Sequence, residues 1–99
     1  MNQAEAHPGY YVLGWRQPNN KVAILCRDSQ GPVLCKSWRE TLKLRTSLLN
    51  DPRATDNLNA LRIIKELRIF RLRKGESLLW RPGDLWVYLD MRVLEQLER

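Results

Sequence analysis

The chain has 99 residues, of which 43% are hydrophobic and 28% are charged, and its formal net charge is +6. This apolar fraction is too high for a disordered chain. The sequence contains no run of 18 apolar residues, which a membrane-spanning helix would need. The polar start has neither the basic flank nor the apolar centre of a secretory signal. We therefore expect a small cytoplasmic protein with a flexible N-terminus (residues 1–9) and a single domain (residues 10–99).

The first half of the domain predicts a three-stranded antiparallel meander. Aromatic and β-branched residues are concentrated in three runs, with turn-forming clusters between them: runs 10–16, 21–27 and 32–36, and turns 17–20 and 28–31. If each cluster is a four-residue loop, Trp15 lies opposite Val22 and Leu13 lies opposite Ile24. One face of the sheet is then almost entirely apolar: Tyr11, Leu13, Trp15, Val22, Ile24, Cys26, Val33 and Cys35.

The opposite face of this predicted sheet is mixed, with cations at its rim, so it would face either solvent or a partner. On the apolar face Cys26 and Cys35 lie diagonally, at roughly 7–8 Å. A disulfide needs Cα atoms at about 4.4–6.8 Å. We therefore expect two free, buried thiols.

Helical signals begin after the third run. The sequence Ser37–Glu40 matches a capping box and predicts a helix that begins at Trp38 and ends before Pro52. Thr55 or Asp56 is the expected cap of a second helix. Its apolar face would carry Leu58, Leu61, Ile64 and Leu67.

The C-terminal third predicts further strands. Residues 67–74 and 78–80 favour a hairpin with its turn at 74–77, and the alternative for residues 67–80 is an extension of the preceding helix. A last helix capped by Asp84 could follow, or instead a strand over 85–89 and a helix capped by Asp90. The predicted fold class is α+β, with an N-terminal three-stranded antiparallel meander packed on helices, a C-terminal hairpin and a terminal helix.

The positive charge is concentrated in the middle of the chain. Residues 1–35 carry a net charge of +1, residues 36–74 carry +7 and residues 75–99 carry −2, which sum to +6. Arginine outnumbers lysine twelve to five, and arginine suits bidentate contacts with phosphate or carboxylate. This pattern indicates either a polyanion-binding surface or a solvated face over which the acidic tail folds back.

Catalytic signatures are missing from the sequence. His7 is the only histidine, so a histidine-based catalytic triad or a multi-histidine metal site is excluded. Nucleotide-binding glycine motifs do not occur, and capping and solvation explain the scattered carboxylates. We therefore expect a non-enzymatic protein with no catalytic residues, no metal and no cofactor.

The leading hypothesis is a nucleic-acid-binding accessory or regulatory protein. In one version, two helices and a wing formed by residues 67–80 approach the nucleic acid. The candidate contact residues of the Arg-rich surface are Arg39, Lys43, Arg62, Lys65, Arg68, Arg71, Arg73 and Lys74. In the other version, the sheet presents its cationic face through Tyr10, Arg16, Lys21 and Arg27.

Two alternatives use protein partners. The chain could be a small inhibitor or adaptor of the phage or mobile-element type that binds an acidic protein surface. It could also be a homodimer in which the amphipathic stretch 85–97 pairs across a two-fold axis.

Overall fold

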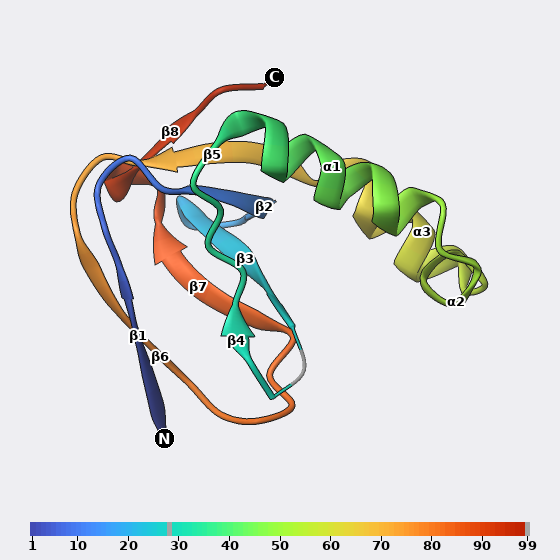
Figure 1. Cartoon of the computed structure of the whole chain (residues 1–99), viewed down its shortest axis with the longest axis horizontal. Helices are drawn as coiled ribbons and strands as arrows, with labels where there is room; N and C mark the ends of the chain where they lie inside the picture. Colours follow the sequence, from blue (N-terminus) through green and yellow to red (C-terminus); the bar gives the residue numbers. More distant parts are fainter. Residues whose placement is uncertain (28, 99) are drawn as a thin grey trace.

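The computed structural model describes residues 1–27 and 29–98, so Asp28 of the predicted turn 28–31 lies outside the described residues. Figure 1 shows strands rolled around a core with a helical layer on one side. The α+β class is confirmed. In chain order the elements are β1 (Asn2–Ala6), β2 (Tyr11–Gln17), β3 (Lys21–Arg27), β4 (Gly31–Pro32), α1 (Trp38–Leu49), α2 (Pro52–Thr55), α3 (Leu58–Glu66), β5 (Arg68–Leu72), β6 (Glu76–Trp80), β7 (Trp86–Asp90), the 3-10 turn η1 (Met91–Val93) and β8 (Leu94–Gln96).

The main sheet is antiparallel and strongly curled. β3 pairs with β2 and β7, while β2 also pairs with β5 and β5 with β8. The short β4 continues along the end of β3. Because η1 connects the outer strands β7 and β8 directly, the two edges of the rolled sheet lie one short turn apart (Figure 1).

The first strand forms a two-stranded ribbon with β6. β1 pairs with β6 and β2 pairs with β5, and in both pairs the partners' residue numbers add to 82, as in Ala6 with Glu76 and Tyr11 with Arg71. The two pairs therefore follow the same register, although they belong to two separate sheets with a break in pairing between them. The predicted hairpin of residues 67–80 is therefore wrong, because β5 and β6 each pair with a strand far away in sequence. The N-terminus, predicted to be flexible, forms β1.

The predicted register of the first hairpin is wrong by one residue. Trp15 lies opposite Ala23 and Gly14 lies opposite Ile24, so the loop contains three residues instead of four. Asn19 and Asn20 both have positive φ in this loop, which asparagine tolerates better than most residues. A shift of one residue moves the side chains of β2 to the other face relative to those of β3, so Leu13 and Ile24 lie on opposite faces of the sheet. The second hairpin is shifted in the same way, with Cys26 opposite Pro32.

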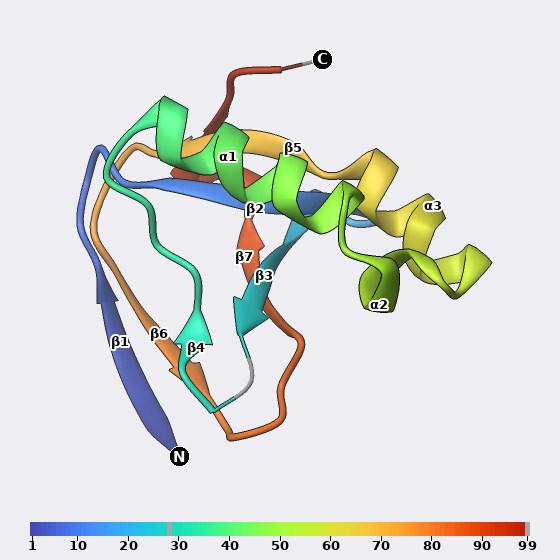
Figure 2. The ribbon, with the colours of Figure 1, turned by 45° about the vertical axis from the view of Figure 1, so that its right-hand side comes forward.

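Both faces of the sheet are buried, by different layers. Inside the roll, Val12, Val22, Ile24 and Phe70 pack against residues of the β1–β6 ribbon such as Leu78. On the outer face, a second cluster is covered by α1 and α3, as Figure 2 shows: Leu13, Ile69 and Leu67 with Trp15, Trp38, Leu42, Leu48 and Ile64. The prediction that Cys26 and Cys35 are free and buried is confirmed.

The helix signals are largely confirmed. The Ser37 side chain accepts a hydrogen bond from the Glu40 amide at 3.1 Å, and α1 begins at Trp38 as predicted. The Glu40 carboxylate reaches back to the Lys36 amide. The predicted cap of the second helix is wrong, because Asn57 caps α3 and Asp51 caps the extra short helix α2.

No long terminal helix exists among the described residues. Residues 86–90 form strand β7, and Asp90 caps only the three-residue turn η1. The alternative with a strand followed by a cap at Asp90 was therefore the closer prediction. Since Val93 and Leu94 are buried in the core, the stretch 85–97 offers no amphipathic helix for pairing two copies.

Candidate functional site

The outer side of α1 carries donor groups. Arg39 and Lys43 lie one turn apart and are exposed, and neutral polar side chains continue the exposed face: Thr46, Ser47 and Asn50. The carboxylate of Glu40 accepts from the Lys36 amide at 2.8 Å, so it is turned towards the start of the helix. The exposed face of α1 is therefore cationic and rich in hydrogen-bond donors.

A groove of about 380 Å³ runs along one flank of α1. Arg27 at the end of β3 and Lys43 of α1 both line it, together with Glu40 and the chain segment 33–35. Two of the predicted contact residues, which come from different versions of the nucleic-acid hypothesis, thus border one groove.

A second groove of about 380 Å³ lies between α1, α3 and the start of β5. It is lined by Arg45, Lys65 and Arg68, with the carboxylate of Glu98 among them. Arg45 donates to Glu98 Oε2 at 2.8 Å, and the Ile69 amide donates to Glu98 Oε1 at 2.9 Å. Burial alone would raise the pKa of Glu98, but the hydrogen bonds from Arg45 and Ile69 outweigh it and lower the pKa. Three cations and one carboxylate leave this groove positively charged.

Arg68 also borders a smaller groove of about 250 Å³ beside β2. In that groove Arg16 donates to Gln96 at 3.0 Å, and the Trp15 indole donates to Glu66 at 2.8 Å. The hydrogen bond from Trp15 connects the C-terminal end of α3 to strand β2. Arg68 itself donates to the carbonyls of residues 65 and 67.

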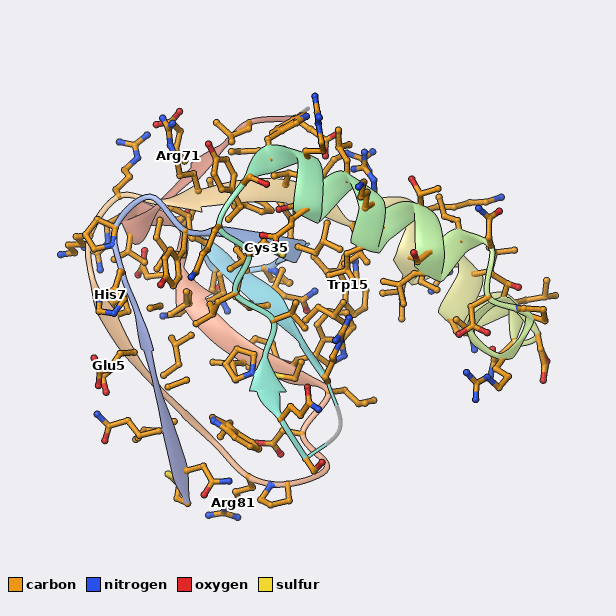
Figure 3. All side chains as sticks on the ribbon, viewed as in Figure 1. Glu5, His7, Trp15, Cys35, Arg71 and Arg81 are labelled. Atoms are coloured by element: carbon orange, nitrogen blue, oxygen red, sulfur yellow. The ribbon has the colours of Figure 1, made fainter. Side chains whose placement is uncertain are left out.

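Several predicted contact residues are engaged elsewhere. Arg71 donates to Glu95 at 2.9 Å, and Lys21 lies 3.7 Å from Asp90. Tyr10 packs edge-on against His7. Arg73 and Lys74 are exposed between β5 and β6, at the opposite end of β5 from α3. Figure 3 labels Arg71, which precedes them in β5.

Both proposed binding geometries therefore need correction. The wing is wrong because residues 67–80 form no hairpin, and its cations lie away from the helices. The cationic sheet face is also wrong: Arg16 lies on the opposite face from Lys21 and Arg27, since the register is shifted by one residue. The helices carry exposed cations, namely Arg39 and Lys43 on α1 and Arg62 and Lys65 on α3.

The sequence reasoning missed Arg45 as a groove residue. It did consider that the acidic tail folds back over the cationic segment, and the structure shows this for two carboxylates. Glu95 pairs with Arg71 and Glu98 pairs with Arg45. The net charge of −2 in residues 75–99 was the signal, but it did not indicate which cations would be paired.

Neutral thiols are favoured at both cysteines. Burial raises the pKa of Cys26 to about 11, with a further contribution from the charge of Asp84. Burial is also the main reason that the pKa of Cys35 is raised. Within residues 1–27 and 29–98, no three side chains of the metal-binding types converge. In the same part of the chain, no helix has the length and apolar character to cross a membrane.

Comparison of the chain with protein-family models, curated proteins and solved structures found no match.

Proposed function

We propose that this chain is a non-enzymatic nucleic-acid-binding accessory module that contacts phosphate groups through its helical layer. One observation carries the proposal: Arg39 and Lys43 of α1 and Arg62 and Lys65 of α3 are exposed and have no ion-pair partner among the described residues. Cations that pair with nearby carboxylates, such as Arg71, are less available to an external anion.

The chemistry of the helical layer favours a phosphate backbone as ligand. Most protein–DNA hydrogen bonds go to phosphates and sugars, from arginine, lysine and neutral polar donors. The exposed face of α1 has this composition, with Arg39 and Lys43 followed by Thr46, Ser47 and Asn50. The flanking grooves add Arg27 on one side and Arg68, beside Lys65, on the other.

The first prediction concerns salt dependence. A labelled 20-base-pair DNA duplex is titrated by fluorescence anisotropy between 50 and 200 mM salt, with an RNA duplex as a second arm. Four phosphate contacts predict a log–log slope of about −3.6, which corresponds to roughly a hundredfold loss of affinity over this range. Replacing Arg39 and Lys43 by glutamate should reduce the slope by about 2.

A matched control separates the helical layer from general charge attraction. The double variant Arg73→Glu with Lys74→Glu changes the net charge by the same amount, but at the far end of β5. It should retain most of the affinity. Equal weakening by both double variants would mean that only net charge matters, and absence of binding at 50 mM salt would remove the proposal.

A further inference from the structure

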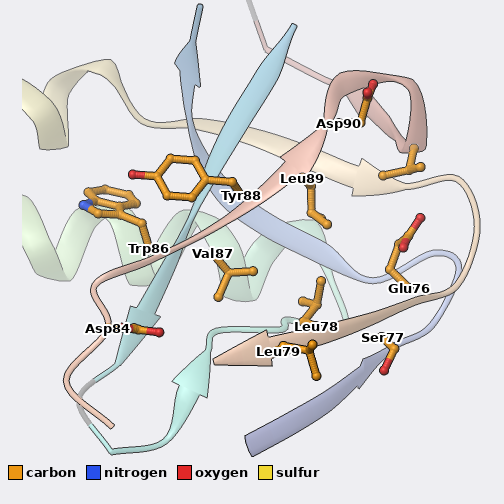
Figure 4. Close-up of a pocket in the computed structure, with 11 residues that line it drawn as sticks. Glu76, Ser77, Leu78, Leu79, Asp84, Trp86, Val87, Tyr88, Leu89 and Asp90 are labelled. Atoms are coloured by element: carbon orange, nitrogen blue, oxygen red, sulfur yellow. The ribbon is translucent and has the colours of Figure 1, made fainter. Parts of the chain in front are cut away.

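A further groove lies on the side of the sheet away from the helical layer. Its volume is about 730 Å³, and it opens between β6 and β7, which follow each other in the chain but do not pair (Figure 4). β6 packs on the inner side of the rolled sheet, whereas α1 and α3 cover the outer side. The cations invoked for nucleic acid do not line this groove, although one of its lining residues, Trp86, packs against Trp15 in the cluster beneath the helices.

One edge of β7 has unpaired backbone groups. Cys26 donates to the Leu85 carbonyl at 2.9 Å, and Met91 donates to the Asn20 carbonyl at 2.8 Å, so odd-numbered residues of this segment direct their backbone groups towards β3. Because neighbouring residues alternate in a strand, the amides and carbonyls of Trp86 and Tyr88 point away from β3. No other strand among the described residues pairs with this edge, which is the arrangement that accepts an added strand.

The walls of the groove combine apolar and acidic side chains. Leu78, Val87 and Leu89 are buried at its base, and Leu79 is 57% exposed. Tyr88 is 61% exposed and projects from the opposite face of β7 from Val87 and Leu89, as Figure 4 shows. Exposed apolar side chains beside an open strand edge are typical of peptide-binding grooves.

Carboxylates lie at both ends of the groove. Asp84 is at one end and Glu76 and Asp90 are at the other, as Figure 4 shows. Asp90 is paired with Arg92 and Lys21. Asp84 accepts only the Arg81 amide, and Glu76 has no ion pair within the described part of the chain. In a chain of net charge +6, this groove is a local acidic surface.

We propose that the groove binds an extended segment of a partner protein, which adds to β7 as a strand and alternates apolar with basic side chains. The backbone edge would supply hydrogen bonds, the apolar base would take every second side chain, and the carboxylates would select lysine or arginine. A strand of five residues spans about 17 Å, so a segment of five to seven residues matches β7. A second copy of this chain is disfavoured, since it would bring the same carboxylates together.

The test uses labelled heptapeptides and fluorescence anisotropy at physiological salt. A peptide of alternating lysine and valine should bind about tenfold more tightly than its glutamate–valine counterpart. A lysine–valine peptide with N-methylated backbone amides should bind about tenfold more weakly, because it cannot donate to the edge of β7. This comparison uses the unaltered protein and does not depend on a variant that folds.

Variants of the protein give the complementary readout. Tyr88→Pro removes an outward-facing amide without loss of a bond to β3, a position at which an edge strand tolerates proline, and should weaken binding of the lysine–valine peptide about tenfold. The double variant Glu76→Gln with Asp84→Asn should also weaken binding of the lysine–valine peptide about tenfold. The control, Glu40→Gln with Asp56→Asn, removes two carboxylates from the helical layer and should leave peptide affinity unchanged.

Three results would overturn the proposal. The first is equal affinity for the lysine–valine and glutamate–valine peptides, and the second is equal affinity for the lysine–valine peptide with and without N-methylation. The third is a concentration-dependent dimer in sedimentation that Tyr88→Pro abolishes, which would assign the edge to a second copy. Loss of duplex binding in the helical-layer variants has no bearing on these results, so the two proposals fail independently.

Discussion

At the scale of single residues, Gly31 has the most demanding environment. Its φ is +80°, a left-handed value that side chains rarely adopt, and an added Cβ would lie 2.3 Å from Cε2 of Trp80. The Trp80 indole is buried with no hydrogen-bond partner for its N–H among the described residues, so its position is determined by packing. Both the backbone and the neighbouring ring therefore require glycine at this turn.

We predict that Gly31→Ala lowers the free energy of unfolding by about 3 kcal/mol, as the sum of backbone strain and a displaced indole. Urea denaturation followed by tryptophan fluorescence measures the loss. Gly83→Ala is the matched control, because Gly83 has φ +93° but no atom within 4 Å of an added Cβ. It should lose only about 1 kcal/mol. Equal losses in the two variants would contradict the role assigned to Trp80.

At the scale of elements, local signals predicted more than distant ones. The Ser37 cap, the end of α1 before Pro52 and the strands near residues 10–27 could be predicted because turn and capping chemistry acts over a few residues. The register could not, since both faces of β2 and β3 are buried and alternation therefore favours neither alignment. The partner of β6 is β1, about 70 positions away, and no local pattern indicates it.

Contacts between residues far apart in the sequence also limited the prediction of the candidate site. The sequence located the cationic segment 36–74, but not which of its cations would be paired. Arg45 meets Glu98 across 53 residues and Arg71 meets Glu95 across 24. Only the folding of β8 against β5 brings these groups together. Whether a cation is paired or unpaired therefore depends on the fold, and a count of charges along the sequence does not distinguish the two cases.

The contact between Glu98 and Arg45 anchors the end of the chain beyond β8 and predicts a pH effect. Because the folded-state pKa of Glu98 is lowered, its stabilising contribution is complete above the unfolded pKa near 4.5 and is lost as the pH falls through the folded value. Glu98→Gln should lower the free energy of unfolding by about 1–2 kcal/mol at pH 7. The difference from the unaltered protein should shrink below pH 4.5.

Denaturation at several pH values, with Glu95→Gln as the comparison, checks this expectation. The side chains of Glu95 and Arg71 are 38% and 42% exposed, against about one fifth for Glu98 and Arg45. Solvent screens the more exposed pair, so its removal should cost at most about 1 kcal/mol. A difference between Glu98→Gln and the unaltered protein that does not change with pH would assign the effect to packing instead of charge.

At the scale of the whole molecule, the rolled sheet separates two surfaces of opposite charge. Unpaired cations lie on α1 and α3 over its outer face, and the carboxylates of the β6–β7 groove lie at the strands that enclose the inner core. Salt screens exposed charges that lie more than about 8 Å apart under physiological conditions. The two surfaces should therefore act independently.

This independence is the last prediction. Tyr88→Pro should change duplex affinity by less than about twofold, and Arg39→Gln with Lys43→Gln should change the affinity for the lysine–valine peptide by less than about twofold. Both are measured by anisotropy at physiological salt with the same protein preparations. A loss of more than about twofold in duplex binding by Tyr88→Pro, or in peptide binding by Arg39→Gln with Lys43→Gln, would mean that the rolled sheet transmits between its faces, and the separation of the two surfaces would then be wrong.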